Sequence, residues 1–273
     1  MWKLILHGLL FIALTAVTQV GGIIYLISFF LHPLLNRRFA QRTWLRRILK
    51  LLAFLTLYLF ISLVVIPPLA KSFGRTPLPI HQSHVQPANI LTVILNRHYV
   101  RPQLKQLLFT TASALHAEYP GSSIVYLDAN FPFINGYPLF PHLSHNDGKK
   151  ADLAFCYREK GGALTSDVPT FSGYGAYEAP LAGEDNMPEI CEQKGHWQYS
   201  ISKAISFSGR NDNLQMDNAR TQTLLRTLSA SPLIQKIFLE PHLKKRLNLT
   251  ESKIRFHGCH AARHDDHIHL QIQ

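Results

Sequence analysis

Residues 253–273 read KIRFHGCHAARHDDHIHLQIQ, and the HIHLQI segment near their end alternates between polar and apolar positions. Such alternation is typical of a β-strand with one buried face. A second stretch, SSIVYLDANF at 122–131, is rich in β-branched and aromatic residues, and ADLAFCY at 151–157 also alternates. The sequence therefore predicts a sheet that includes the C-terminal strand.

Helical spacing of apolar residues occurs in three further stretches. Residues 101–119 carry apolar residues at helical spacing, and a Pro-Gly pair ends the pattern: Leu104, Leu107, Leu108, Ala112 and Leu115. Residues 217–229 and 232–247 predict two more helices, the second with proline in its first turn. Residues 158–200 are rich in Gly, Pro and acidic side chains, so we expect loops there. Strands mixed with helices in this way predict an α+β domain with a mixed, antiparallel sheet.

Charge is distributed unevenly along the 273 residues. The chain has 28 Lys and Arg against 17 Asp and Glu, for a formal net charge of +11. Residues 1–75 hold nine of the basic residues and none of the acidic ones, so residues 76–273 carry only +2. The positive charge therefore belongs to the N-terminal quarter, and we expect no nucleic-acid partner.

Two charge-free apolar stretches, 4–35 and 51–70, predict a membrane anchor, because about 20 apolar residues in a helix cross the hydrocarbon core. The segment between them, HPLLNRRFAQRTWLRRILK, carries five Arg and one Lys, and the positive-inside rule places it in the cytoplasm. We therefore expect two transmembrane helices within 1–75, a linker over 76–98 and an exported domain over 99–273.

Two other interpretations of the apolar stretches stay open. A cleaved signal peptide would have an apolar core of about 7–15 residues, shorter than the first stretch. Two buried helices of a soluble protein would show a polar face, and neither stretch does. The anchor is favoured over both, and the sequence leaves the oligomeric state open.

The three cysteines all lie in the part expected outside the cytoplasm, where one disulfide can form and one thiol remains. Cys191 with Cys259 is the preferred pair, because Cys156 falls within a predicted strand. The sequence leaves the other pairings open.

Histidines are abundant, at fifteen, and many of them gather in two segments. On a strand, the side chains of His267 and His269 project from the same face about 6.5–7 Å apart. Both can therefore reach one centre, or one can bind a metal while the other addresses the metal's water. His145 and Asp152 would complete three protein ligands and leave a fourth position open, as in catalytic zinc sites. Surface histidines, or a His-rich tract that carries copper or nickel, are the simpler explanations of the same residues. His142 is interpreted as a hydrogen-bonding loop residue.

Ser-His-x-x-Gly-x-x-x-Asp at 144–152, followed by His-x-His at 267–269, resembles the metallopeptidase group of lysostaphin-type enzymes, D-alanyl-D-alanine peptidases and hedgehog signalling domains. Within that group, the chain is most similar to penicillin-insensitive murein endopeptidases. Their tail reads His-x-x-His-x-His, the spacing of His264, His267 and His269 here. The resemblance covers roughly residues 120–273.

The resemblance implies a role for each matching residue. His145, Asp152 and His269 would be the ligands of a Zn²⁺ cofactor. His267 would handle the proton of the attacking water or stabilise the developing oxyanion, and His264 would support the site.

The function implied is that of a zinc-dependent hydrolase that cleaves amide bonds in peptidoglycan peptides. Such a metallopeptidase would lie in a bacterial inner membrane, with its C-terminal domain in the periplasm and two helices in the lipid bilayer. Two alternatives remain: a catalytically inactive zinc-holding module that binds cell-wall peptides or a protein partner, and a His-rich membrane protein that handles metal ions.

Overall fold

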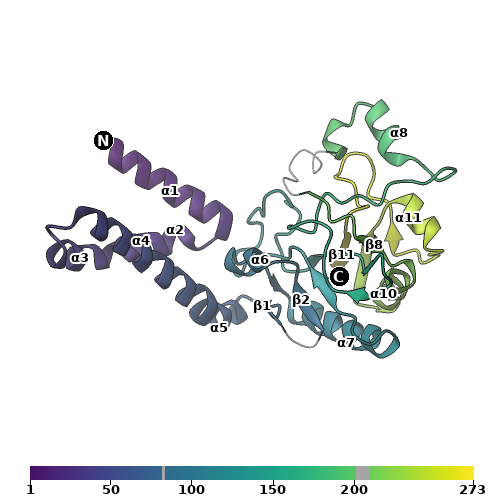
Figure 1. The fold of residues 1–273 in the computed structure, drawn as a ribbon, viewed down its shortest axis with the longest axis horizontal. Coiled ribbons are helices and arrows are strands. Elements are labelled where there is room, and N and C mark those ends of the chain that lie inside the picture. Colours follow the sequence, from purple (N-terminus) through teal and green to yellow (C-terminus); the bar gives the residue numbers. More distant parts are fainter. Residues whose placement is uncertain (82–83, 201–208) are drawn as a thin grey trace.

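The computed structural model describes residues 1–81, 84–200 and 209–273, and it divides them into a projecting helical bundle and a larger α+β part (Figure 1). The bundle comprises α1 (Trp2–Thr18), α2 (Gly21–Ser28), η1 (Phe29–Leu31), α3 (His32–Arg38), α4 (Thr43–Phe60), η2 (Ile61–Val65) and α5 (Ile66–Ser72).

The last three bundle elements form one continuous helix, Thr43–Ser72, with a π-helical turn at η2. Its 30 residues span about 45 Å at 1.5 Å per residue. Among the described residues it is the one helix long and apolar enough to cross a membrane. The second predicted span therefore has a matching helix.

The first predicted span, 4–35, is divided in the structure, so the expected pair of transmembrane helices is not confirmed. α1 ends at Gln19, whose φ of 67° is left-handed, and α2 runs back along α1 (Figure 1). His7 Nδ1 lies 2.5 Å from the hydroxyl of Tyr25, which shows the antiparallel packing. Two consecutive glycines after the turn explain the break, because glycine is a poor helix former and lets backbones approach closely.

The larger part is built on a six-stranded mixed sheet in the order β10-β9-β11-β5-β4-β2. β11 pairs antiparallel with β5 and β9, whereas β10–β9 and β2–β4 are parallel, and the predicted α+β class is confirmed. The strands are β2 (Val85–Pro87), β4 (Ile124–Tyr126), β5 (Lys150–Leu153), β9 (Ile234–Phe238), β10 (Ile254–Arg255) and β11 (Ile268–Ile272).

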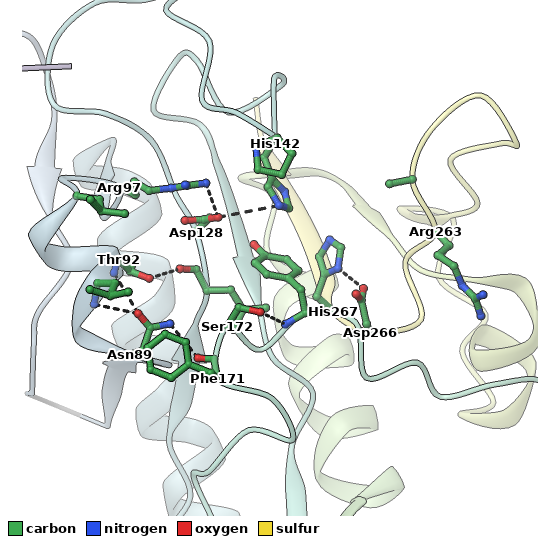
Figure 2. A pocket seen from close by; sticks show the side chains of 16 residues that line it. Asn89, Thr92, Arg97, Asp128, His142, Phe171, Ser172, Arg263, Asp266 and His267 are labelled. Atoms are coloured by element: carbon green, nitrogen blue, oxygen red, sulfur yellow. Dashed lines mark hydrogen bonds and ion pairs between the residues drawn. The ribbon is translucent and has the colours of Figure 1, made fainter. Parts of the chain in front are cut away.

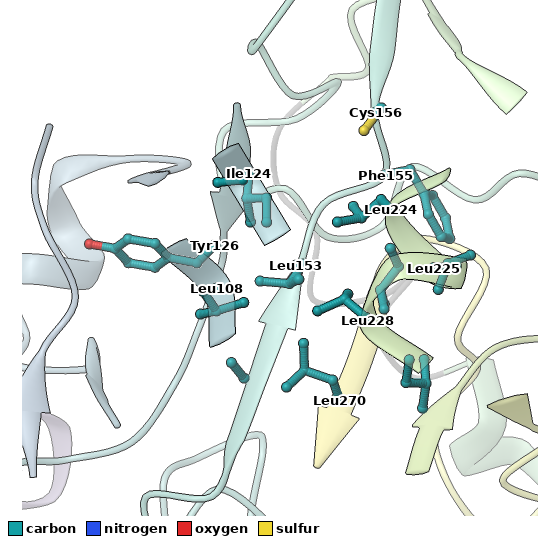
Figure 3. Close-up of a cluster of buried hydrophobic side chains, with 14 of the residues drawn as sticks. Leu108, Ile124, Tyr126, Leu153, Phe155, Cys156, Leu224, Leu225, Leu228 and Leu270 are labelled. Atoms are coloured by element: carbon teal, nitrogen blue, oxygen red, sulfur yellow. The ribbon is translucent and has the colours of Figure 1, made fainter. Parts of the chain in front are cut away.

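Two helices, α7 (Pro102–Glu118) and α10 (Asn218–Ala230), cover one face of this sheet and confirm the predicted helices there. Leu108 of α7 and Leu228 of α10 pack with Leu153 and Leu270 of the central strands (Figure 3). Ile268, Leu270 and Ile272 alternate with His267, His269 and Gln271 and are all buried in this core. The alternation of β11 therefore directs the imidazole of His269 to the opposite face of the sheet.

The remaining elements are short. They are β1 (Thr76–Pro77), α6 (Ile90–Ile94), β3 (Tyr99–Val100), β6 (Tyr157–Glu159), β7 (Leu164–Thr165), α8 (Met187–Gln193), η3 (Trp197–Ser200), β8 (Leu214–Met216) and α11 (Pro241–Arg246). The 76–98 segment, expected as a linker, contributes β1, β2 and α6, and β2 pairs with β4 in the main sheet.

One predicted helix, over 232–247, is wrong. Its first half is β9 and only its second half is the short helix α11. Ile234, Ile237 and Phe238 are buried between β10 and β11, so neighbouring strands decide the conformation of a segment whose apolar spacing also suits a helix.

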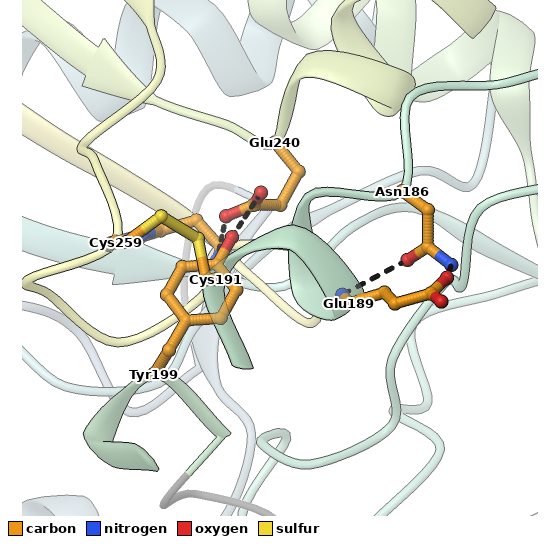
Figure 4. Close-up of a disulfide and its surroundings, with 7 residues drawn as sticks. Asn186, Glu189, Cys191, Tyr199, Glu240 and Cys259 are labelled. Carbon is orange, nitrogen blue, oxygen red and sulfur yellow. Dashed lines mark hydrogen bonds between the residues drawn. A yellow bond between two sulfur atoms is a disulfide. The ribbon is translucent and has the colours of Figure 1, made fainter. Parts of the chain in front are cut away.

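A disulfide joins Cys191 of α8 to Cys259 in the loop before β11, and the preferred pairing is confirmed (Figure 4). Cys156 is a buried free thiol. The bridge attaches α8 to the segment that leads into His267 and His269.

The helix packing predicts a difference between two glycine substitutions. A Cβ at Gly22 would lie 2.6 Å from the carbonyl oxygen of Phe11, whereas a Cβ at Gly8 would meet nothing within 4 Å. We expect Gly22→Ala to lower the free energy of unfolding in detergent micelles by about 1–3 kcal/mol. Gly8→Ala should leave it unchanged or raise it slightly. Equal effects of the two substitutions would contradict the antiparallel packing of α1 and α2.

Candidate metal centre

The pairing of β5 with β11 places Asp152 directly opposite His269. Their side chains meet on the face away from the leucine core, and His269 Nδ1 lies 2.8 Å from Asp152 Oδ1. Asp152 is fully buried and His269 is 5% exposed. The register between two strands thus joins residues 117 positions apart in the chain.

His145 reaches the same point from the loop before β5. Its Nε2 lies 3.2 Å from Asp152 Oδ1 and 3.1 Å from His269 Nδ1. Its Nδ1 lies 2.7 Å from the carbonyl oxygen of Ala129, which can only accept a hydrogen bond. Nδ1 therefore carries the proton, and the lone pair of Nε2 faces Asp152 and His269.

The three atoms form a triangle with sides of 2.8, 3.1 and 3.2 Å. Ligand atoms at zinc distances in a tetrahedral arrangement lie about 3.3 Å apart. The three ligands predicted from the sequence, His145, Asp152 and His269, therefore come together at a spacing that fits a small metal ion. Two imidazole nitrogens and one carboxylate oxygen are also donors that zinc accepts.

His142 is a residue that the sequence analysis placed outside the ligand set. Its Nδ1 lies 2.9 Å from the other carboxylate oxygen of Asp152, Oδ2. His142, His145 and Asp152 offer ligand atoms within 4.8 Å of one another, so this group too could hold a metal ion. The sequence feature that could have identified His142 as a candidate ligand is its position three residues before His145.

Several neighbouring side chains stabilise the negative charge of Asp152. Burial by itself raises the pKa of a carboxyl group, but the imidazoles of His145, His267 and His142 together hold the pKa of Asp152 well below its usual range. The hydroxyl of Tyr174 also donates a hydrogen bond of 2.7 Å to Oδ2. Tyr174 lies in a loop-rich segment, and no sequence motif marked it.

His267 lies beside the triangle, with Nε2 3.8 Å from Asp152 Oδ1. Its Nδ1 donates a hydrogen bond of 2.5 Å to Asp266, whose other oxygen accepts 2.7 Å from the backbone N–H of Gly175. Burial disfavours the charged imidazolium, but Asp266 and Asp152 outweigh it and raise the pKa of His267 to about 9. Asp266 thus orients an imidazole that is in its cationic, doubly protonated form at neutral pH.

His264 is buried next to the triangle, with its ring centroid 5.0 Å from that of His267 and 5.7 Å from that of His269. Burial lowers its pKa well below the ordinary value. Within the described residues its Nδ1 has no hydrogen-bond partner. His264 therefore contributes a neutral ring at the edge of the site.

A cavity of about 330 Å³ opens beside His142, His267 and Tyr174 (Figure 2). Its lining includes the apolar side chains Leu91, Leu95, Leu127, Pro141 and Phe171. An ion pair of 2.8 Å between Arg97 and Asp128 lies in the same wall. Asp128 is 4.0 Å from His142 Nε2, so the charged part of the wall adjoins the metal centre.

A buried network holds the segment that carries the last histidines (Figure 4). Glu240 accepts hydrogen bonds from the hydroxyl of Tyr199 at 2.5 Å and from the backbone N–H of His264 at 2.9 Å. Burial raises the pKa of Glu240 to about 7. The carboxyl group therefore titrates near neutral pH.

We expect the full chain to bind one Zn²⁺ tightly, measured by metal analysis after dialysis against a competing chelator. Asp152→Asn should weaken binding more than about 100-fold, because changes to residues behind a metal ligand already cost 10–100-fold. His142→Ala should keep the ion if His145, Asp152 and His269 are the ligands. Asp167→Asn, at an exposed position, is the control. Unchanged zinc affinity in Asp152→Asn would contradict the site.

Glu240 predicts a pH dependence of stability. Its pKa is raised in the folded protein, so folding takes up a proton, and stability falls as pH rises from about 4.5 to about 7. The loss approaches about 3 kcal/mol. We expect Glu240→Gln to gain stability relative to the native chain between pH 5 and pH 8, measured by denaturant unfolding. A difference in the free energy of unfolding between Glu240→Gln and the native chain that stays constant with pH would refute the raised pKa.

No protein-family model matches the chain, and no curated protein matches it significantly. The function is therefore argued from the site.

Proposed function

We propose that the protein is a zinc-dependent peptidase that hydrolyses amide bonds in peptidoglycan peptides next to the inner membrane. The observation that carries this proposal is the triangle of His145 Nε2, Asp152 Oδ1 and His269 Nδ1 with His267 directly beside it. Three protein ligands and one open position are the pattern of catalytic zinc sites, whereas structural sites use four.

Zinc is the metal that the donors favour. Imidazole suits zinc, and one carboxylate completes a ligand set that needs no cysteine thiolate. When bound there, zinc would act as a Lewis acid toward a carbonyl oxygen and make water a stronger nucleophile. The buried carboxylate of Asp152 supplies negative charge that would balance part of the charge of a dication.

His267 is assigned the proton chemistry. Its Nε2 points toward the triangle, and Asp266 holds its Nδ1, so the ring presents one N–H to a substrate at the open position. A protonated imidazole at this place stabilises negative charge that develops on the carbonyl oxygen. It can also donate a proton to the leaving amine.

The cavity beside His142 and His267 is assigned to the substrate. A strand of peptide would pass along its apolar wall and bring one amide to the open position. Arg97 and Asp128 offer one charge of each sign at this wall, which suits a peptide with free carboxylate and amino groups. Cell-wall stem peptides carry both, and the resemblance of the motifs at 144–152 and 264–269 to those of murein endopeptidases favours the same substrate class.

The helix Thr43–Ser72 supports a location at the membrane. The Arg-rich segment before it would face the cytoplasm, and the domain after it would lie in the periplasm. An oxidising compartment also agrees with the disulfide between Cys191 and Cys259.

The test is cleavage of purified cross-linked muropeptides by the full chain in detergent, followed by chromatography of the products. We expect His267→Ala to lower kcat at least about 100-fold while the chain retains its zinc. His196→Ala, a partly exposed histidine outside the site, should cleave at the native rate. Stoichiometric zinc without cleavage of any muropeptide would refute the peptidase and favour a zinc-holding module that binds wall peptides.

A further inference from the structure

Two histidines of the metal centre lie on a loop without regular structure. Residues 131–149, all of which the structure describes, contain no helix or strand and lead from β4 to β5. They carry His142 and His145, whose imidazoles lie 2.9 and 3.2 Å from oxygens of Asp152. No ladder of strand hydrogen bonds fixes this loop, so contacts with other segments must hold the two imidazoles in place.

Arg75 joins the two ends of the loop. It lies in the turn between α5 and β1 and is 1% exposed. Its Nη1 donates a hydrogen bond to the carbonyl oxygen of Phe131, where the loop begins. Its Nη2 donates to Oδ1 of Asn135 at 2.7 Å and to the carbonyl oxygen of Asn146 at 3.2 Å. The N–H of Gly136 also donates to that carbonyl oxygen, at 2.8 Å. One guanidinium therefore holds both sides of the span that contains the two histidines.

Oxygen atoms of the loop stabilise the buried charge of Arg75. Within residues 1–81, 84–200 and 209–273, no carboxylate forms an ion pair with Arg75, whereas the equally buried Arg220 pairs with Asp217 at 2.8 Å. Burial and the charge of Arg101 lower the pKa of Arg75 to about 10, while Asp147 acts to raise it. A buried cation is unfavourable unless hydrogen-bond acceptors surround it. Loss of the guanidinium would in turn leave these loop oxygens without their donors.

The helical bundle contacts the same loop at further points. Oε1 of Gln19, at the turn between α1 and α2, accepts a hydrogen bond of 2.9 Å from the N–H of Phe133. The hydroxyl of Tyr137 donates one of 2.8 Å to the carbonyl oxygen of Thr15 in α1. The side chain of Phe133 packs against a buried apolar cluster that includes Ile24 of α2. The bundle and Arg75 therefore hold the loop together.

The helix that leads to Arg75 is docked on the α+β part of the molecule (Figure 1). The hydroxyl of Tyr58 donates a hydrogen bond of 2.6 Å to the carbonyl oxygen of Ile94 in α6. The side-chain amide of Asn96 donates one of 3.3 Å to the hydroxyl of Ser62. The N–H of Arg75 donates at 3.0 Å to a carbonyl oxygen of α5. The position of Arg75 thus follows that of the docked helix.

We propose that Arg75 is a positioning residue of the metal centre, which sets the places of His142 and His145 and connects them to the docked bundle. The proposal rests on the metal centre in the proposed function, because it concerns how that centre is held. Arg75 does not line the substrate cavity, and it acts through the loop. The bundle then contributes to metal affinity as well as to location.

Arg75→Lys tests the proposal, because lysine keeps the charge but lacks the planar fork that reaches both ends of the loop. We expect the full chain with this substitution, in detergent, to bind Zn²⁺ at least about tenfold more weakly in a chelator competition. The visible absorption bands of the Co²⁺-loaded chain should also shift, because they report the ligand geometry. Arg220→Lys is the matched control, because Arg220 is an equally buried arginine that donates to the carbonyl oxygen of Tyr157 outside the loop. It should keep the native zinc affinity and the native spectrum.

A second variant tests the loop contact without changing the buried charge. Gln19→Met removes the acceptor of the Phe133 N–H, so we expect weaker zinc binding and a shift of the Co²⁺ bands in the same direction. Equal zinc affinities and equal Co²⁺ spectra of the Arg75→Lys and Arg220→Lys chains would overturn the proposal. If Arg75→Lys does not fold, native zinc affinity in Gln19→Met would overturn it. A native chain that binds no zinc would refute the metal centre of the proposed function, and the positioning role with it.

Discussion

The antiparallel pairing of β5 with β11 is the constraint on which the site depends. Its register sets Asp152 opposite His269, and the strand period of two sends Ile268 and Leu270 into the leucine core while the imidazoles project from the other face. A shift by one residue would bury the histidines in the core and expose the leucines. The hydrophobic effect that stabilises the sheet therefore also aligns the ligands.

Burial gives the site its chemistry. A carboxylate excluded from water is unfavourable unless opposite charge or hydrogen-bond donors surround it. Asp152 has the hydroxyl of Tyr174 and several imidazoles around it, and Asp266 pairs in turn with His267. Each buried acid thus has a donor that fixes its orientation. The arrangement leaves little freedom to the ring of His267, and a preorganised donor of this kind is what stabilisation of a developing oxyanion requires.

The sequence predicted the parts of the fold in which local pattern and tertiary environment agree. The alternation of β11, the amphipathic spacing of α7 and α10 and the preference for the Cys191–Cys259 pair are confirmed. The helix predicted over 232–247 is wrong because the spacing of the apolar residues there suits a helix as well as a strand that is buried between neighbouring strands. The reversal at Gln19 was missed, because hydropathy gives the length of an apolar stretch but not the point at which the chain turns back. The positions of the Tyr174 and His142 side chains depend on the conformations of loops, which no periodicity in the sequence predicts.

We propose that His145, Asp152 and His269 hold one zinc ion with an open position beside His267. Anomalous diffraction at the zinc edge from crystals of the zinc-loaded protein tests it most directly. We expect a single strong peak within about 2.0–2.2 Å of His145 Nε2, Asp152 Oδ1 and His269 Nδ1. A peak at another histidine pair, such as His196 and His260, with nothing beside Asp152, would contradict it.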